Sequence, residues 1–282
     1  MVLGSCFADE MGSRLKAAGF NVMVNPFGTL YNPESIAAAV ERLGSAAPFT
    51  EADCVEMGAG AARICSFSHH TSFSRPSAEE FLAVANDALE RAAEFWRGCN
   101  RVIVTLGTAM VWRRGGVTVS NCLKRPAREF THEMLDDAAV QAALRRIVGA
   151  GSAAGSVSSL ASPALPAPLA GKSFLFTVSP IRHLSLGAHA NTLSKARLQL
   201  SLDAFLQSDE GTCCTYFPAY EILLDELRDY RFYAEDMCHP SSTAAGVIWE
   251  KFVETVVPAA DHERMKENER QYRRSLHRTM LE

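Results

Sequence analysis

The stretch SAEEFLAVANDALERAAEFWRGCNRVIVTLG (residues 77–107) decides the fold class of this chain. Its first part repeats apolar residues with a helical period after Ser77, and Glu80 three residues later completes the pattern of a capping box. The β-branched run that follows, RVIVTL, predicts a buried strand that ends at Gly107. A long amphipathic helix followed directly by a buried strand is typical of a parallel sheet with helical crossovers.

The same alternation of strand and helix continues along the chain. Strands are expected at residues 1–3, 21–24, 101–107, 172–180 and 212–218, and helices at 6–18, 33–43, 77–99, 131–150, 191–209, 219–227 and 241–259. Asn32 is the candidate N-cap of the second helix, with Pro33 at its first position. We therefore expect an α/β fold, a three-layer α/β/α sandwich around a central parallel sheet.

The expected domain organisation is simple. Residues 1–260 form one domain, because the alternation resumes unchanged after its one break in composition, at 149–171. That stretch consists almost entirely of Gly, Ala, Ser and Pro, and we interpret it as a flexible loop between a helix and the next strand. Residues 261–282 are rich in charge and predict a solvated C-terminal helical tail.

The composition argues against several classes of protein. A formal net charge of -4 over 282 residues gives no basic surface for nucleic acid. No run approaches the roughly 18 apolar residues of a membrane span, and the N-terminus lacks the pattern of a secretory signal. The eight cysteines show no CxxC pairs, which favours free thiols in a reducing compartment, the cytoplasm. A first strand of three residues is short and suggests a missing leader or a truncated start.

Polar residues follow three predicted strands at the point where each strand ends. They are Gly4-Ser5, Gly107-Thr108 and the segment SPIRH (179–183). The carboxyl ends of parallel strands gather at one edge of an open sheet, where functional groups lie. A further candidate is the loop YAEDMCHPSS (233–242), in which Asp236 and His239 stand three residues apart.

Ser5 has two interpretations. As the residue before a helix it can be an N-cap, whose oxygen accepts a backbone N–H. As a nucleophile it needs a histidine to take its proton, and that histidine needs an acid to fix its tautomer. Asp236 and His239 can supply both groups from one turn. A surface Asp/His pair is the commoner occurrence of this spacing, and its combination with the Gly-Ser turn is what favours catalysis.

Six stretches of the chain resemble the GSCFA domain family, which is grouped with the SGNH/GDSL hydrolases. They are GSCFA (4–8), NPFGTLYNP (25–33), LGTAMVW (106–112), TVSPIRH (177–183), YFPAYEILLDELRDYRFYAEDMCHPS (216–241) and IWEKF (248–252). The resemblance implies a flavodoxin-like α/β/α fold of the SGNH hydrolase type. It matches Ser5 to the GDSL serine, and Asp236 and His239 to the D-x-x-H motif of the last block.

The resemblance also implies a mechanism for a serine hydrolase. His239 takes the proton of Ser5 as the hydroxyl attacks an ester carbonyl, and Asp236 orients and stabilises the imidazolium. Water then releases the acyl group from the serine. The backbone N–H groups of Ser5 and Gly28 are the expected donors to the oxyanion.

The third oxyanion donor departs from the SGNH pattern, in which an asparagine follows a central strand. Thr108 stands in the corresponding block and is our first candidate, with Asn121 and Asn32 as alternatives. Leu123 stands where the family tends to have a histidine, and this affects substrate binding more than the triad.

Three residues are candidates for substrate binding: Asn32, Arg182 and His183. Arg182 and His183 follow a strand end and could bind a carboxylate or a sugar hydroxyl. The alternative for them is a structural ion pair with the segment DELRDY (225–230).

Cys6 is the competing nucleophile. One residue along a helix turns the side chain by about 100°, so if Ser5 faces the crevice, Cys6 is expected to pack against the sheet as a small apolar residue. His69 and His70 are expected at most at the rim of the pocket. No metal site and no cofactor is predicted.

The sequence therefore predicts a serine esterase that hydrolyses an O-acyl ester of a carbohydrate or a lipid-like molecule. An O-acyltransferase that uses the same acyl-serine is one alternative, and a non-catalytic binding module of the same fold is the other. The expected partner is a small-molecule, glycan or lipid ester, and neither nucleic acid nor an integral membrane segment is expected.

Overall fold

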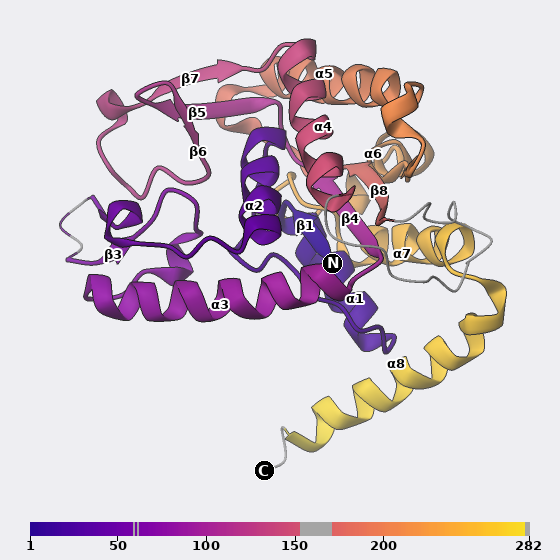
Figure 1. Ribbon diagram of the computed structural model, residues 1–282. Helices are drawn as coiled ribbons and strands as arrows, with labels where there is room; N and C mark the ends of the chain where they lie inside the picture. The colour runs from indigo at the N-terminus through magenta and orange to yellow at the C-terminus, as the bar shows by residue number, and fades with distance from the viewer. Residues whose placement is uncertain (59, 61, 153–170, 280–282) are drawn as a thin grey trace.

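A four-stranded parallel sheet forms the centre of the protein (Figure 1). The computed structural model describes residues 1–58, 60, 62–152 and 171–279. The strands lie in the order β1-β4-β8-β9 and comprise Val2–Gly4, Arg101–Leu106, Ser173–Val178 and Cys214–Tyr216. All three neighbouring pairs are parallel, which confirms the α/β fold expected from the sequence.

The strand expected at 21–24 is reduced to one bridge between Val24 and Val2. Two hydrogen bonds tie this segment to β1: Val2 N–H donates to Met23 O at 2.9 Å and Asn25 N–H donates to Val2 O at 3.0 Å. The pairing stops there because Asn25 adopts a left-handed φ of 41° and Pro26 has no N–H to donate. The predicted strand was therefore wrong in extent, although the segment lies where a fifth strand would.

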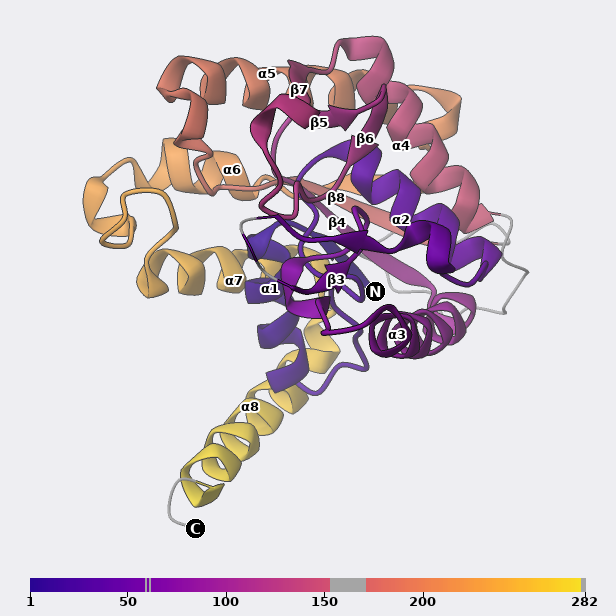
Figure 2. The ribbon, with the colours of Figure 1, turned by 90° about the vertical axis from the view of Figure 1, so that its left-hand side faces the viewer.

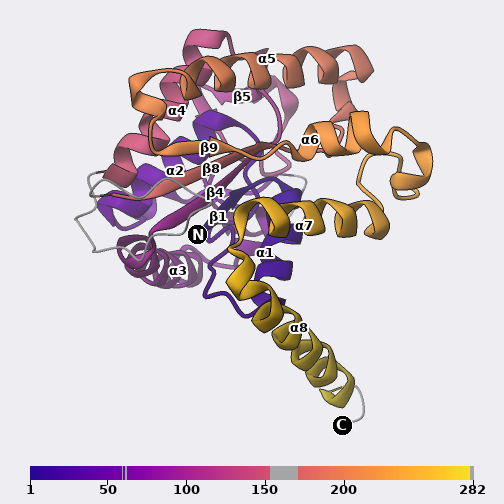
Figure 3. The same ribbon diagram turned by 90° about the vertical axis from the view of Figure 1, so that its right-hand side faces the viewer.

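Helices cover both faces of the sheet, as side chains that alternate along each strand require (Figure 3). Val2 packs with α1 (Cys6–Ala17) and α7 (Ser242–Val256) on one face. Leu3 packs on the opposite face, in the larger core. Four helices contribute to that core: α2 (Pro33–Ser45), α3 (Ala78–Gly98), α4 (Asp137–Ser152) and α5 (Ala188–Leu206). The result is the expected three-layer sandwich.

Helix starts followed their sequence signals. Asn32 caps α2, where its Oδ1 accepts the Ser35 N–H at 2.8 Å, and Pro33 is the first helical residue. Ser77 caps α3, where its Oγ accepts the Glu80 N–H at 3.2 Å. Both predicted N-caps are confirmed.

Two small antiparallel sheets were not predicted. One is the pair β2 (Val55–Glu56) and β3 (Ile64–Cys65); the other has the order β6-β5-β7, with β5 at Met110–Arg114, β6 at Val117–Val119 and β7 at Thr131–Met134 (Figure 2). The helix predicted over 131–150 was therefore wrong at its start. Residues 131–134 alternate between exposed and half-buried and pair with β5, and α4 begins only at Asp137.

The chain between β9 and α7 is irregular. The helix predicted at 219–227 starts as one turn, α6 (Ala219–Glu221), and continues as a π-helix over Ile222–Leu227. Arg228 ends it in the left-handed region, with a φ of 43°. A π-helix and a non-glycine residue with positive φ are each uncommon and are frequent at functional sites.

The last helix, α8 (Ala259–Thr279), runs away from the body of the protein (Figure 1). Its first half is not solvated all round, because Met265 is buried and Asn268 Nδ2 donates to Ala18 O at 3.0 Å. Of the loop expected at 149–171, the first residues belong to α4, which extends to Ser152. Residues 153–170 lie outside the described part of the chain.

No helix in the described part of the chain combines the length and the apolar character that a membrane span requires. All eight cysteines are free thiols, and Cys65 is the one classed as fully buried.

Candidate functional site

The turn between β1 and α1 places Ser5 at the carboxyl edge of the sheet. Gly4 has a φ of 135°, and a Cβ there would lie 2.1 Å from Thr105 O on the neighbouring strand. A Cβ on Gly107 would lie 2.9 Å from Tyr31 O and 3.3 Å from Ser5 Cβ. The ends of β1 and β4 therefore approach so closely that both glycines are required.

Ser5 is buried, with an exposed fraction of 2 %. It is the N-cap of α1, and its Oγ accepts the Phe7 N–H over a long 3.4 Å. Among the described residues this is the one hydrogen bond of Ser5 Oγ, and none joins it to His239. In this structure the Ser5 hydroxyl acts as a helix N-cap. A hydrogen bond between Ser5 and His239 stays a prediction.

Asp236 and His239 form a hydrogen-bonded pair, as their spacing predicted. Asp236 Oδ2 lies 2.5 Å from His239 Nδ1, and its Oδ1 accepts the backbone N–H groups of Cys238 and His239 at 2.9 Å each. These N–H groups and the imidazole lower the pKa of Asp236 to about 2. An ionised carboxylate on Nδ1 holds the proton there and leaves Nε2 free to act as a base.

A groove of about 320 Å³ lies beside this pair. Its lining comprises Cys6, Phe7, Glu10, Ile181, His239, Pro240, Ser242 and Ala245. Cys6 and His239 thus share one groove. The prediction that Cys6 packs against the sheet was made for a Ser5 that faces the crevice, and here Ser5 is the buried residue of the two. The reason is that Ser5 precedes the helix in an extended conformation (φ -69°, ψ 179°), so the 100° step between helical neighbours does not apply to it.

Tyr31 is a site residue that the sequence reasoning missed. Its Oη lies 3.5 Å from Cys6 Sγ, and its carbonyl accepts the N–H groups of Gly107 and Thr108 at 2.8 Å each. Burial, with Cys6 beside the phenol, raises the pKa of Tyr31 to about 12. Tyr31 therefore joins the end of β4 to the start of α1 as a neutral phenol, and no local sequence signal marks this role.

Asn25 was missed as well. Its Oδ1 accepts the Gly4 N–H at 2.8 Å, and its Nδ2 donates to Asp9 Oδ1 at 2.7 Å. The side chain thus fixes the Gly4–Ser5 turn from the opposite side. Its signal in the sequence is the dipeptide Asn25-Pro26, which predicts a turn but not what the turn holds.

The backbone donors predicted for the oxyanion already have partners. Each N–H donates to a carbonyl: Ser5 to Thr105 at 3.3 Å, Gly28 to Asn25 at 2.8 Å and Thr108 to Tyr31 at 2.8 Å. The bond of Ser5 is the longest of the three. Each of these N–H groups would have to break its bond to a carbonyl before it could donate to the oxyanion.

The side chains considered for the same role are also engaged. Thr108 Oγ1 is 2.9 Å from Ser194 Oγ and accepts the Met110 N–H at 3.0 Å. Asn121 Oδ1 accepts the Leu123 N–H at 2.8 Å, and Asn32 Oδ1 serves as the cap of α2. Asn121 is absent from the lining of the groove beside His239.

The Cys6 N–H is a free donor at this turn. It belongs to the first turn of α1, where backbone N–H groups have no partner within the helix. No described residue accepts a hydrogen bond from it. The residue after a nucleophile at a strand-to-helix turn supplies an oxyanion donor in other hydrolases, so sequence reasoning could have found it.

Arg182 contacts the predicted segment, but by stacking rather than by an ion pair. Its guanidinium carbon lies 3.9 Å from the ring centre of Tyr233 and 5.5 Å from that of Tyr230. Its backbone N–H donates to Cys238 O at 3.0 Å, which ties the end of β8 to the Asp236–His239 loop.

His183 lies beside Tyr31 and Asn191. The two ring centres are 6.5 Å apart, and the His183 N–H donates to Asn191 Oδ1 at 2.9 Å. Burial, followed by the charge of Lys195, lowers the pKa of His183.

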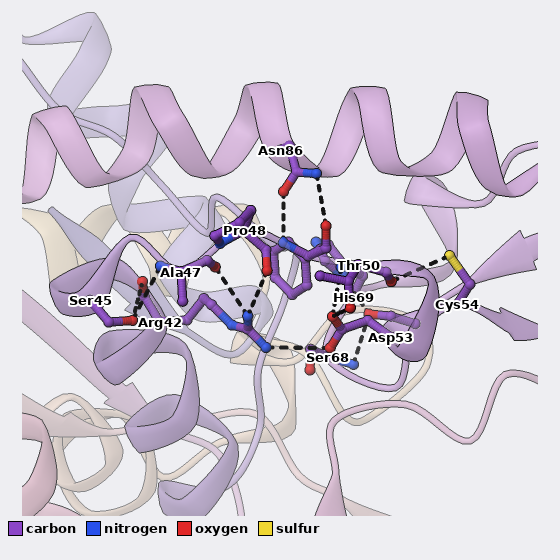
Figure 4. Close-up of polar contacts among 12 residues, drawn as sticks. Arg42, Ser45, Ala47, Pro48, Thr50, Asp53, Cys54, Ser68, His69 and Asn86 are labelled. Atoms are coloured by element: carbon purple, nitrogen blue, oxygen red, sulfur yellow. Dashed lines mark hydrogen bonds and ion pairs between the residues drawn. The ribbon is translucent and has the colours of Figure 1, made fainter.

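His69 belongs to the core and not to the rim of the groove. Its ring is fully buried, with the centre 4.6 Å from that of Phe49 and Nδ1 2.6 Å from Ser66 Oγ. Burial lowers the pKa of His69 to about 4, so the ring is neutral. The segment 47–49, whose Phe49 packs on this ring, is held by two side chains (Figure 4). Asn86 accepts the N–H of Phe49 and donates to its carbonyl, and Arg42 donates to the carbonyls of residues 47 and 48.

Lys195, on α5, is buried beneath the same edge of the sheet. Its exposed fraction is 1 %, and Nζ donates to Gly107 O and to Ser179 O at 2.7 Å each. These carbonyls stand just past the ends of β4 and β8. The ammonium therefore braces the two strand ends, and its burial lowers the pKa of Lys195 to about 7.

Lys195→Met should destabilise the protein by about 2–4 kcal/mol, because two buried carbonyls lose their donor. The unfolded chain holds this proton up to the ordinary pKa of 10.5, whereas the folded protein releases it near 7. Since the unfolded state then binds more protons, the free energy of unfolding of the wild type rises with pH between these values. The loss on substitution should rise in parallel.

Denaturant unfolding across this pH range measures the effect, with Lys251→Met as the control. Lys251 forms an exposed pair with Glu226, which contributes about 0–1 kcal/mol. A loss in Lys195→Met no larger than in the control would contradict the bracing role.

The fold and this edge of the sheet define a class of protein: a three-layer α/β protein with an Asp–His pair beside the first turn of the helix that follows its first strand. The chain belongs to the GSCFA family, whose model matches residues 1–252. This family is related to the SGNH hydrolases. Comparisons with curated proteins and with solved structures found no match.

Proposed function

We propose that this protein hydrolyses O-acyl esters with Ser5 as the nucleophile and the Asp236–His239 pair as its base. The observation that carries the proposal is the 2.5 Å hydrogen bond between Asp236 and His239 in a groove that begins at the first turn of α1. An oriented imidazole next to a Gly-Ser turn is the arrangement that serine hydrolysis needs.

The nucleophile has to leave its cap before it can react. Its bond to the Phe7 N–H is long, at 3.4 Å, so rotation of the Ser5 side chain costs about 1 kcal/mol or less. His239 Nε2 then takes the hydroxyl proton as Oγ bonds to the ester carbon, and the alcohol leaves with that proton. Water attacks the acyl-serine by the same route and restores the hydroxyl.

The rotation of Ser5 also prepares the oxyanion site. It frees the Phe7 N–H, which joins the unpartnered N–H of Cys6 at the positive end of α1. Two backbone donors, each worth about 3–4 kcal/mol in related sites, then face the tetrahedral intermediate. We propose these two groups in place of Thr108 and Asn121, whose side chains are engaged elsewhere.

The substrate that we propose is an O-acyl group on a carbohydrate or a lipid-like alcohol. The lining of the groove mixes apolar side chains, such as Phe7 and Ile181, with polar ones, such as Glu10 and Ser242, which suits a short acyl chain and a hydroxylated leaving group. Transfer of the acyl group to a second alcohol would use the same residues. Eight free thiols support a reducing compartment, the cytoplasm, as the place of action.

The thiol of Cys6 is the second candidate nucleophile, and one observation favours it. Cys6 already lines the groove with His239, whereas Ser5 is buried. A thiolate would serve the same ester chemistry. A non-catalytic binding module is the remaining alternative.

Labelling with a fluorophosphonate separates these candidates. The reagent should phosphonylate Ser5, with loss of fluoride, and peptide mapping by mass spectrometry should place the label on the N-terminal peptide. Hydrolysis of an activated short-chain ester should disappear in proportion to labelling. Hydrolysis without a label on Ser5 would contradict the serine assignment, and neither hydrolysis nor label would favour a binding module.

A further inference from the structure

A second cavity lies close to the groove. Its volume is about 190 Å³, and its lining comprises Arg182, Leu223, Leu224, Arg228, Asp229, Tyr230 and Tyr233. We call it the arginine pocket. Ile181 lines the groove and Arg182 lines the arginine pocket, so adjacent residues connect the two cavities.

The two arginines of this pocket have no carboxylate partner among the described residues. The guanidinium of Arg182 is held flat against Tyr233, and one of its nitrogens donates to Met237 O at 3.3 Å. The side chain of Arg228 makes no hydrogen bond to a described residue. The one acid in the lining, Asp229, is already paired with Arg231 at 2.9 Å.

Arg228 adopts a left-handed backbone conformation, which residues with a Cβ rarely adopt. Its N–H closes the π-helix by donating to Leu223 O at 3.3 Å, and its φ of 43° is costly for a residue with a Cβ. Arg228 is the C-cap of this helix, and a left-handed residue at that position is a common way for a helix to end. Arg228 is exposed and its side chain has no partner among the described residues, so its guanidinium is available to a ligand from solution.

The chemistry of the lining indicates an oxyanion. A guanidinium presents several N–H donors in a plane and matches the two oxygens of a carboxylate or a phosphate. Stacking on Tyr233 fixes that plane before a ligand arrives, which reduces the entropy that binding costs. Tyr230, with 67 % of its surface exposed, can cover an apolar face such as that of a sugar ring.

We propose that the arginine pocket binds an oxyanion, a carboxylate or a phosphate carried by the ester substrate. The pocket itself stands on its own geometry, and its link to an ester rests on the proposed hydrolase function. Arg182 N–H and Cys238 O join the pocket to the loop of His239, so an anion bound there places the acyl group of the same molecule at the groove. The substrate class is then an O-acylated acidic molecule rather than a neutral one.

Calorimetric titration with inorganic phosphate and, separately, with glucuronate tests the pocket without any catalysis. The wild type should bind at least one of them. Arg228→Gln should raise the dissociation constant for that anion by about tenfold. Arg97→Gln is the matched control, because Arg97 on α3 has no partner among the described residues and lies outside the pocket. Thermal unfolding should be unchanged in both variants, since neither side chain holds another residue.

Three acetyl esters separate the sources of the anion: acetylated glucuronate, acetylated glucose 6-phosphate and acetylated neutral glucose. In Arg228→Gln, kcat/KM should fall about tenfold for the anionic ester that binds best and stay unchanged for the neutral one. Equal loss for all three esters, or equal anion binding in the wild type and Arg228→Gln, would overturn the pocket. Arginine-dependent anion binding without ester hydrolysis would keep the pocket and overturn the hydrolase.

Discussion

Ser5→Ala should abolish ester hydrolysis, with a loss of about 10⁶-fold in kcat. The reason is that Ser5 carries the serine hydroxyl at the turn that begins α1, where the groove of His239 starts. The measurement is hydrolysis of an activated short-chain ester under saturating conditions. Cys6→Ser in the same assay should keep most of the activity.

The control for Ser5→Ala has to reproduce the loss of an N-cap, which costs about 1 kcal/mol of stability. Ser77→Ala does this, because Ser77 caps α3 by the same kind of bond and is not part of the groove. It should lower the free energy of unfolding to a similar extent and leave kcat unchanged. Activity that survives in Ser5→Ala and disappears in Cys6→Ser would assign the nucleophile to the thiol.

Asp236→Asn should lower kcat by about 10⁴-fold without unfolding the loop. Asparagine keeps an Oδ1 for the N–H groups of Cys238 and His239, so the turn can persist. Its Nδ2 is a donor, however, and forces Nδ1 of His239 to accept, which moves the ring proton to Nε2. The imidazole then presents a proton to Ser5 where it has to present a lone pair.

The decisive measurement for this pair is a double-variant cycle. Residues that act as one unit lose far less together than the sum of their single losses. Asp236→Asn combined with Ser5→Ala should therefore be no slower than Ser5→Ala alone. Additive losses would show that Asp236 acts on the loop and not through His239. Because its pKa is about 2, Asp236 stays ionised at every pH at which the assay is practical.

The parts of the fold that the sequence predicted are those encoded by local pattern. The helix after Ser77 and the strand from Arg101 follow a periodicity and a cap that lie within a few residues of each other. The strand at Thr131–Met134 was missed because only its pairing with β5, some twenty residues earlier, makes it a strand. Residues 131–134 stand just before α4 and happen to continue its helical pattern, so the sequence predicted one helix over 131–150.

The candidate site divides in the same way. The Asp236–His239 pair forms within one turn, and its spacing alone predicted it. The exposure of Cys6 and the burial of Ser5 depend on the backbone of the turn and on Tyr31, which arrives from another loop. No local pattern carries that information.

The π-helix at Ile222–Leu227 has a consequence for how the arginine pocket can change. A π-turn holds one residue more than an α-turn, and here the Arg228 N–H closes it by donating to Leu223 O, five residues back. Removal of one residue between these two would let the same N–H close an ordinary α-turn on the same carbonyl. The wall of the arginine pocket can therefore change in chain length at a single point while Arg228 keeps its place, a change that no comparison of side-chain identities reveals.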